Sequence, residues 1–109
     1  MKSMATDSVD GRLAGFAAWY VTADRAAAKL DKLYVVQSLQ RIGLGGRLIG
    51  RVADLARDAG ASVLVLNVNK HNIQAIRAYE KHGFAIREAV VVDIGGGFVM
   101  DDYVMAMAL

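Results

Sequence analysis

The amino-acid sequence predicts a mixed α/β (α+β) domain, with helices packed on a mostly antiparallel sheet that contains a central βαβ unit. Three observations lead to this fold class. Apolar residues alternate with other residues near both ends of the chain, they recur at helical spacing in two segments, and a β-branched run separates those segments. The 109 residues contain no repeat, low-complexity tract or linker, so we expect residues 1–109 to form one domain.

The first elements are expected to be a hairpin and a third strand. Asp10 and Gly11 form a two-residue turn signal, and alternate positions of residues 13–21 are apolar or small. A short strand before residue 9 should therefore pair with residues 13–21. Residues 29–36 follow a polar connection and are rich in leucine and valine, which favours a central strand.

The middle of the chain is expected to form a β-α-β unit. From Gly45 onward the apolar residues follow one helical stripe, charged residues occupy the other face, and Gly60 ends the pattern. Residues 62–68 are rich in valine and leucine, which suits a strand buried on both faces. A strand reached through a helix favours a right-handed crossover and a parallel pair with residues 29–36.

A second helix and a second hairpin should complete the fold. Asn72 is a favourable N-cap, apolar residues continue at helical spacing to Tyr79, and Gly83 ends the helix. Residues 84–93 and 98–109 then form two strands about a turn of three glycines.

Composition excludes several classes of protein. The 13 basic and 11 acidic residues give a net charge of +2, and the arginines are scattered, which argues against nucleic acid as a partner. The apolar runs are too short to span a bilayer, and the polar N-terminus lacks a signal peptide. The absence of cysteine removes thiolate ligands and disulfides, and two histidines alone make no metal site. We therefore expect a cytoplasmic protein whose ligand is a compact anion.

The glycine-rich segment of residues 40–46 joins a predicted strand to a predicted helix. Glycines let successive amide N–H groups converge on one anion at the positive end of a helix dipole, and a pyrophosphate is the natural ligand. The segment lacks the lysine and spacing of a P-loop. It also lacks the third glycine of a dinucleotide fingerprint, so ATP and NAD are both disfavoured. The alternative is that these glycines only make a tight turn.

Two ordered motifs resemble those of the GNAT superfamily of N-acetyltransferases. Gln40 through Gly45 is similar to that family's acyl-CoA pyrophosphate loop, Gln/Arg-x-x-Gly-x-Gly/Ala. Residues 72–84 are similar to its Asn-x-x-Ala-x-x-x-Tyr-x-x-x-Gly-Phe segment. The resemblance covers residues 30–109. Members of the family usually begin with a further strand and two helices, which this short chain lacks.

The resemblance implies a set of acetyl-CoA contacts. The central-strand backbone would bind the pantetheine arm, and Asn72 would face the cosubstrate from the start of the second helix. Arg41 and Arg47 would add positive charge near the phosphates, although each could equally be a solvated surface charge. The strand residues concerned are Leu33, Tyr34 and Val35. The amides that would hold the pyrophosphate belong to Gln40, Arg41, Ile42, Gly43, Leu44, Gly45 and Gly46.

The resemblance also implies that Tyr79 is the acid that protonates the leaving thiolate. A phenol with a pKa near ~10 can transfer a proton to a thiolate whose conjugate acid has a pKa near ~8.5. The alternatives are that Asn72 is only an N-cap and Tyr79 only a core aromatic. The sequence does not identify the general base. Asp31 is placed slightly ahead of the other candidates, which are Glu88, Asp93, His71 and His82.

Together these expectations describe an acyl-CoA-dependent N-acetyltransferase. Without a cysteine nucleophile, direct transfer to a primary amine in a ternary complex is favoured. The acceptor would be a small molecule or a peptide. The alternative is a non-catalytic acyl-CoA-binding module or an inactive remnant of an acetyltransferase. A homodimer is expected, because the missing helices would leave apolar surface uncovered.

Overall fold

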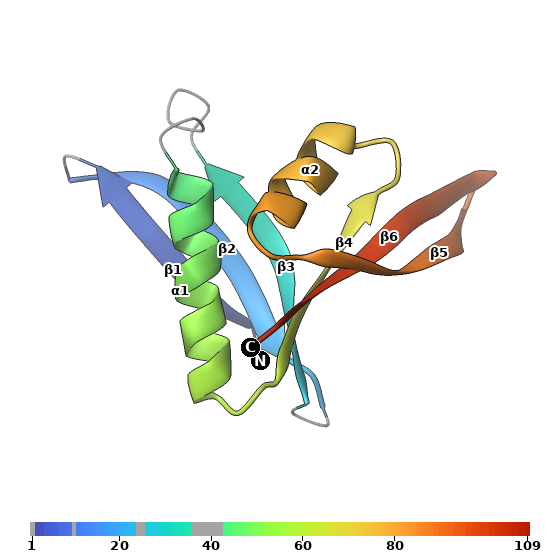
Figure 1. Cartoon of the computed structure of the whole chain (residues 1–109). Coiled ribbons are helices and arrows are strands. Elements are labelled where there is room, and N and C mark those ends of the chain that lie inside the picture. Colours follow the sequence, from blue (N-terminus) through green and yellow to red (C-terminus); the bar gives the residue numbers. More distant parts are fainter. Residues whose placement is uncertain (1, 10, 24–25, 36–42) are drawn as a thin grey trace. The chain divides into compact units, whose positions relative to one another are not determined.

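A computed structural model describes residues 2–9, 11–23, 26–35 and 43–109 of the chain (Figure 1). These residues form six strands, mostly antiparallel, and two helices, which confirms the predicted fold class and element order. The chain divides into two compact units, Met1–Leu64 with Ala108–Leu109, and Val65–Met107. We refer to them as the first and second units.

The first unit is an antiparallel meander with a helix packed on it. Strands β1 (Lys2–Val9), β2 (Arg12–Val21) and β3 (Ala27–Val35) pair in that order, and helix α1 (Leu44–Asp58) contacts all three. The predicted first hairpin is confirmed, since Val9 pairs with Arg12 and Gly11 has a φ of 75°. The final residue of the predicted strand 29–36 lies outside the described residues.

Small residues on β2 let α1 approach the sheet closely. A Cβ atom placed on Gly15 would lie 2.6 Å from the Tyr34 carbonyl oxygen and 3.0 Å from Cδ1 of Leu48. Leu48 and Val52 of α1 are fully buried, as is Ala17 of β2. The packing of α1 on the sheet therefore requires a residue without a side chain at position 15, which pairs with Val35 of β3.

The second unit contains a helix and three strands in the order β4-β6-β5. Strand β4 (Val63–Asn69) begins in the first unit and continues here, followed by α2 (Ile73–Lys81), β5 (Ala85–Gly95) and β6 (Phe98–Ala108). Beyond β4, the Lys70 N–H donates to the Asp101 carbonyl at 3.0 Å.

Burial along β4 differs from the prediction. Leu64, Leu66 and Val68 are buried, whereas Val63 and Val65 are only half-buried. The strand thus has one fully covered face and not two. Its uniform run of apolar residues could not reveal this asymmetry, because valine suits both degrees of burial.

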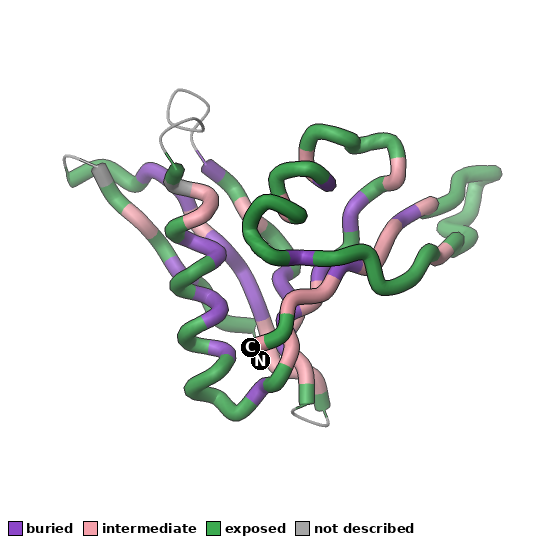
Figure 2. The backbone as a smooth tube through the Cα atoms, viewed as in Figure 1, coloured by how far each residue is buried: buried purple, intermediate pink, exposed green. Residues whose placement is uncertain are grey.

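The outer part of the second hairpin is exposed. Every residue from 91 to 100 is exposed, although most of them are apolar (Figure 2). In the described part of the chain, no helix is long and apolar enough to span a membrane.

Candidate functional site

The end of β3 lies beside the start of α1 in the first unit. A Cβ atom placed on Gly45 would lie 4.0 Å from Cγ2 of Val35. The strand and helix that the family resemblance assigns to the pantetheine arm and the pyrophosphate are therefore adjacent at this end. Of the predicted phosphate-loop residues, Gln40, Arg41 and Ile42 lie outside the described residues.

Gly43 has the backbone conformation that the predicted loop requires. It is the N-cap of α1 and has a φ of 81°, in the left-handed region that glycine tolerates best. No described side chain caps the helix, and the first turn carries no acidic residue. The first helical bond runs from the Arg47 N–H to the Gly43 carbonyl at 3.1 Å. The N–H groups of Leu44, Gly45 and Gly46 precede it and have no intrahelical acceptor, so they can face an anion.

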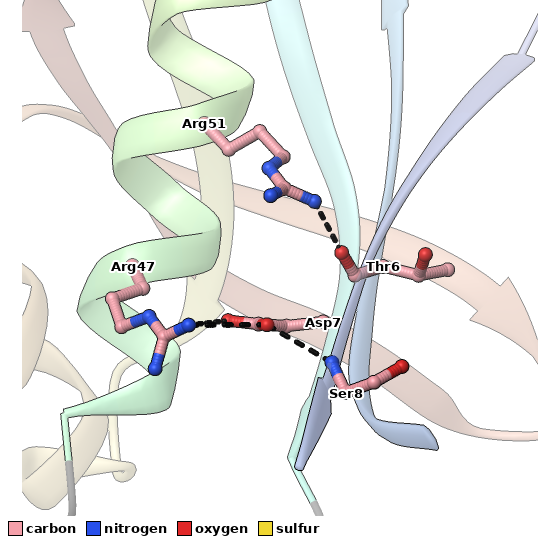
Figure 3. Close-up of polar contacts among 5 residues, drawn as sticks. All are labelled: Thr6, Asp7, Ser8, Arg47 and Arg51. Atoms are coloured by element: carbon pink, nitrogen blue, oxygen red, sulfur yellow. Dashed lines mark hydrogen bonds and ion pairs between the residues drawn. The ribbon is translucent and has the colours of Figure 1, made fainter. Parts of the chain in front are cut away.

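Two arginines of α1 bind β1. The Arg47 guanidinium donates to Asp7, at 3.2 Å to Oδ1 and 3.0 Å to Oδ2, and Arg51 donates to the Thr6 carbonyl (Figure 3). Asp7 is mostly covered, with 12% of its side chain exposed. The expectation that Arg47 adds free positive charge for a phosphate is thus not supported, because a carboxylate neutralises it.

The β3 residues differ in exposure. Val35 is buried, Leu33 is half-buried, and Tyr34 is 54% exposed with its ring centroid 5.7 Å from that of Phe16. Because a pantetheine arm would bind to the backbone of this strand, these side-chain differences do not oppose the predicted role.

Asn72 is the N-cap of α2, as predicted. Its side-chain oxygen accepts a hydrogen bond from the Ala75 N–H at 3.2 Å. This hydrogen bond is the one that an N-cap residue makes, so an asparagine at this position is explained without a ligand. A contact with acetyl-CoA stays a prediction.

Tyr79 lies on the same helix and is half-buried. Its ring meets that of Phe84 edge to face, with centroids 5.7 Å apart. Burial raises the pKa of its phenol above the ordinary value of 10.0. The hydroxyl therefore keeps its proton at neutral pH, and no described residue hydrogen-bonds to it. It can serve as a proton donor.

Asp31 is a poor candidate for the general base. The Lys2 ammonium donates to its Oδ2 at 2.7 Å, and this hydrogen bond lowers the pKa of the carboxyl below its ordinary value. A carboxylate with a lowered pKa is a weaker base. Among the other candidates, Asp93 accepts a hydrogen bond from the Gly95 N–H at 2.8 Å, and Glu88, His71 and His82 are exposed.

Two residues that shape the first unit were missed from the sequence. Asp7 anchors the first turn of α1, but its partner Arg47 lies forty positions away and no local pattern links them. Gly15 lies between Leu13 and Ala17 in the apolar alternation of β2, and a glycine inside a strand was a usable signal of a close approach. Across the described residues, no three His, Cys, Asp or Glu side chains gather in a way that could hold a metal ion.

The described residues combine a mostly antiparallel sheet, two helices and a glycine N-cap at the start of α1, the helix that follows β3 along the chain. The chain belongs to the acetyltransferase (GNAT) family, whose sequence pattern matches residues 3–84. This match begins before the region of the resemblance and ends at Phe84, the last residue of the second motif.

Individual relatives agree with this assignment. An uncharacterized N-acetyltransferase of Mycobacterium bovis is 32% identical over 108 residues, which cover 99% of this chain and 68% of that protein. A streptothricin acetyltransferase of Streptomyces lavendulae is 40% identical over 76 residues, or 70% of this chain and 40% of that one. In fold, the chain is similar to a GNAT acetyltransferase of Elizabethkingia anophelis with acetyl-CoA bound. That likeness has a TM-score of 0.84 at 18% identity and covers 99% of this chain and 76% of the other.

Proposed function

We propose that the chain is an N-acetyltransferase that moves the acetyl group of acetyl-CoA to a primary amine by direct transfer in a ternary complex. Family membership gives the acetyltransferase class and acetyl-CoA as the cosubstrate. One observation carries the proposal. Helix α1 begins with Gly43 as its N-cap and Gly45 in its first turn, and Gly45 lies beside Val35 at the end of β3.

The residues at this helix start fit the phosphates of acetyl-CoA. Among the residues that the structure describes, none has an atom within 4 Å of a Cβ placed on Gly43, which leaves room for a ligand on that side. The N–H groups of the first turn have no intrahelical acceptor and can supply donors, and the helix dipole favours negative charge. The buried Val35 and half-buried Leu33 would border the pantetheine arm, which the family resemblance assigns to the backbone of β3.

Acetyl-CoA supplies an activated thioester. The acceptor amine must attack in its neutral form, and no residue in this chain is assigned to remove its proton. Tyr79 holds a proton on its hydroxyl at neutral pH, because its pKa is raised. It would give that proton to the departing sulfur, so that CoA leaves as a thiol and the amide bond replaces the thioester bond. The nitrogen loses its proton to solvent, and the phenolate takes one back from solvent.

The second candidate function is a non-catalytic acyl-CoA-binding module, or an inactive remnant of an acetyltransferase. The capping role of Asn72 and the packing of Tyr79 on Phe84 favour it, since both residues are explained without chemistry. Such a protein would depend on Gly43 and Gly45 but not on the Tyr79 hydroxyl.

The two candidates are separated by measuring release of CoA thiol from acetyl-CoA in the presence of amines. The amines should include small molecules, such as polyamines and amino acids, and peptides. A thiol reagent is well suited, because the chain has no cysteine and contributes no background. Amine-dependent thiol release supports the enzyme. Saturable acetyl-CoA binding with no release for any amine supports the binding module.

Two further proposals concern the setting of this activity. We place the protein in the cytoplasm, where a chain without disulfides needs no oxidising environment. We also propose a homodimer, because exposed apolar residues at the outer end of the second hairpin favour association.

A further inference from the structure

Asp102 of β6 carries a buried carboxylate that the proposed reaction does not use. Its exposed fraction is 7%, and it is the one buried polar or charged residue that the described chain contains, glycines aside. Among the described residues, none donates a hydrogen bond to its side chain or forms an ion pair with it. A covered carboxylate without a protein partner is unfavourable for a fold, and a cationic ligand would offset that cost.

The preceding residue, Asp101, has a partner on the other face of the sheet. The Lys70 ammonium forms an ion pair with Oδ1 of Asp101 and lies 5.7 Å from the ring centroid of Tyr103. Successive side chains of a strand point to opposite faces, so Asp101 and Tyr103 share one face and Asp102 points to the other. Lys70 therefore neutralises Asp101 and not Asp102.

Apolar side chains surround Asp102 on its own face. Val90 of β5 is directly opposite Asp102 in the strand register, and Val104 and Met100 are two residues away along β6. The two valines are half-buried and Met100 is 40% exposed, so the cover decreases towards the outer part of the hairpin. The carboxylate oxygens are not fully enclosed, since the one enclosed and unpartnered side-chain polar atom in the described chain is Nε1 of Trp19. A ligand can therefore reach the carboxylate.

A second carboxylate lies on the same face. Glu88 is opposite Val104, which makes it a diagonal neighbour of Asp102, at about 7–8 Å between Cα atoms. Glu88 is exposed, and no described residue forms an ion pair with it. Since no three His, Cys, Asp or Glu side chains of the described chain gather, a metal ion is disfavoured. Two carboxylates beside valines instead favour an organic cation with an aliphatic chain.

We propose that Asp102 binds an ammonium group of the acceptor, and that the acceptor is an aliphatic diamine or polyamine. The Asp102 carboxylate holds one nitrogen as an ammonium, Glu88 adds negative charge, and methylene groups contact Val90 and Val104. Another nitrogen of the same molecule, in its neutral form, attacks the thioester. The inference rests on the proposed function, whose acceptor it specifies, and it assigns no proton transfer to Asp102.

Calorimetric titration with putrescine, a diamine, tests the site without turnover. With CoA present, we expect saturable binding by the native chain and a Kd that is about tenfold higher or more in Asp102→Asn, because the ammonium loses its charged partner. Asp101→Asn is the matched control on the same strand. Its Kd for putrescine should equal that of the native chain, since the carboxylate it removes is already paired with Lys70.

Turnover gives a second readout that a loss of folding would not mimic. In the thiol-release assay, Asp102→Asn should raise the KM for putrescine about tenfold or more and leave kcat within about twofold, because the bound nitrogen is not the reacting one. Butylamine has the same carbon chain and a single nitrogen. Its KM should be the same for the native chain and Asp102→Asn.

The native chain offers a test that needs no variant. In carbon-13 spectra, putrescine should shift the side-chain carboxyl signal of Asp102 and leave that of Asp101 unchanged. An Asp102 signal that does not move, or equal putrescine affinity of the native chain and a folded Asp102→Asn, would overturn the proposal. Putrescine binding at Asp102 without thiol release would remove the proposed activity only. Acetyl transfer to other amines without putrescine binding would remove the Asp102 site only.

Discussion

The two candidate functions, an enzyme and a binding module, assign different roles to Tyr79. Its phenol packs on Phe84, and burial raises its pKa above 10.0, so it is protonated throughout the neutral range. Replacement by phenylalanine keeps the ring that packs on Phe84 and removes the hydroxyl group, which carries the proton to be donated.

We expect Tyr79→Phe to lower kcat by about 100-fold, the lower end of the range for a general acid, with acetyl-CoA affinity within about twofold. Native activity should fall on the alkaline side only as the pH passes above 10.0, where the phenol loses its proton, and the variant should lack this decline. Tyr20→Phe, which removes a hydroxyl from β2, serves as the control. Unchanged turnover by Tyr79→Phe from pH 6 to 9 would exclude the acid role.

Asp31 has a structural explanation in its ion pair with Lys2. We expect Asp31→Asn to leave kcat/KM within about twofold, since a carboxylate with a lowered pKa is a weak base. A loss of 100-fold with normal acetyl-CoA binding would restore it as the base.

The same ion pair gives a pH dependence of stability. The pKa of Asp31 is lower in the folded chain, so its stabilisation is present above the ordinary carboxyl value of 3.8 and is lost as the pH falls through the folded value. Lys2 has a raised pKa, so its contribution is present below 10.5 and is lost as the pH rises through the folded value. Melting temperatures of the native chain and Asp31→Asn should therefore differ slightly at pH 7 and converge towards both extremes.

At the scale of elements, α1 and β2 depend on each other through Gly15. Gly15→Ala would place a methyl group 2.6 Å from the Tyr34 carbonyl oxygen, which forces the backbone or α1 to move. We expect a destabilisation of about 1–3 kcal/mol in urea unfolding.

Gly50 is the matched control on α1. No described residue has an atom within 4 Å of a Cβ placed there, so Gly50→Ala should stabilise the helix by about 0.5–1 kcal/mol. Equal effects of the two substitutions would show that the close approach at Gly15 does not limit the packing of this unit.

Most elements could be predicted because local signals mark their ends. Gly60 and Gly83 follow the two helices with positive φ, and the glycine turn places β5 and β6 within two residues of the predicted bounds. Contacts between distant segments could not be predicted. The Asp7–Arg47 pair and the Lys2–Asp31 pair each join residues about 30 to 40 positions apart, and single charges carry no mark of their partners.

In the candidate site, too, the features with a local signal could be predicted and the others could not. The glycine at the start of α1 and the Asn72 cap follow from local chemistry, and the structure has both. The roles of Leu33, Tyr34, Val35 and Tyr79 came from the family resemblance, because a strand backbone and a half-buried phenol leave no functional signature in a single sequence.

At the scale of the whole molecule, the account depends on acetyl-CoA binding by a chain of 109 residues that covers 68% of its Mycobacterium bovis relative. Gly45 is the position at which binding can be removed while the fold is kept. Within the described part of the chain, the one atom near a Cβ placed on Gly45 is Cγ2 of Val35, at 4.0 Å, so we expect the fold to tolerate a side chain that would displace a phosphate. Gly50→Arg, on an exposed face of the same helix, is the control.

The most direct test is calorimetric titration of the native chain, Gly45→Arg and Gly50→Arg with acetyl-CoA, with dephospho-CoA and ATP as reference ligands. We predict saturable binding of acetyl-CoA near one per native chain, equal binding by Gly50→Arg, no heat from ATP, and at least a 100-fold loss in Gly45→Arg. Binding that Gly45→Arg retains while folded, or a folded native chain that does not bind acetyl-CoA, would contradict the assignment of the glycine turn to the cosubstrate phosphates.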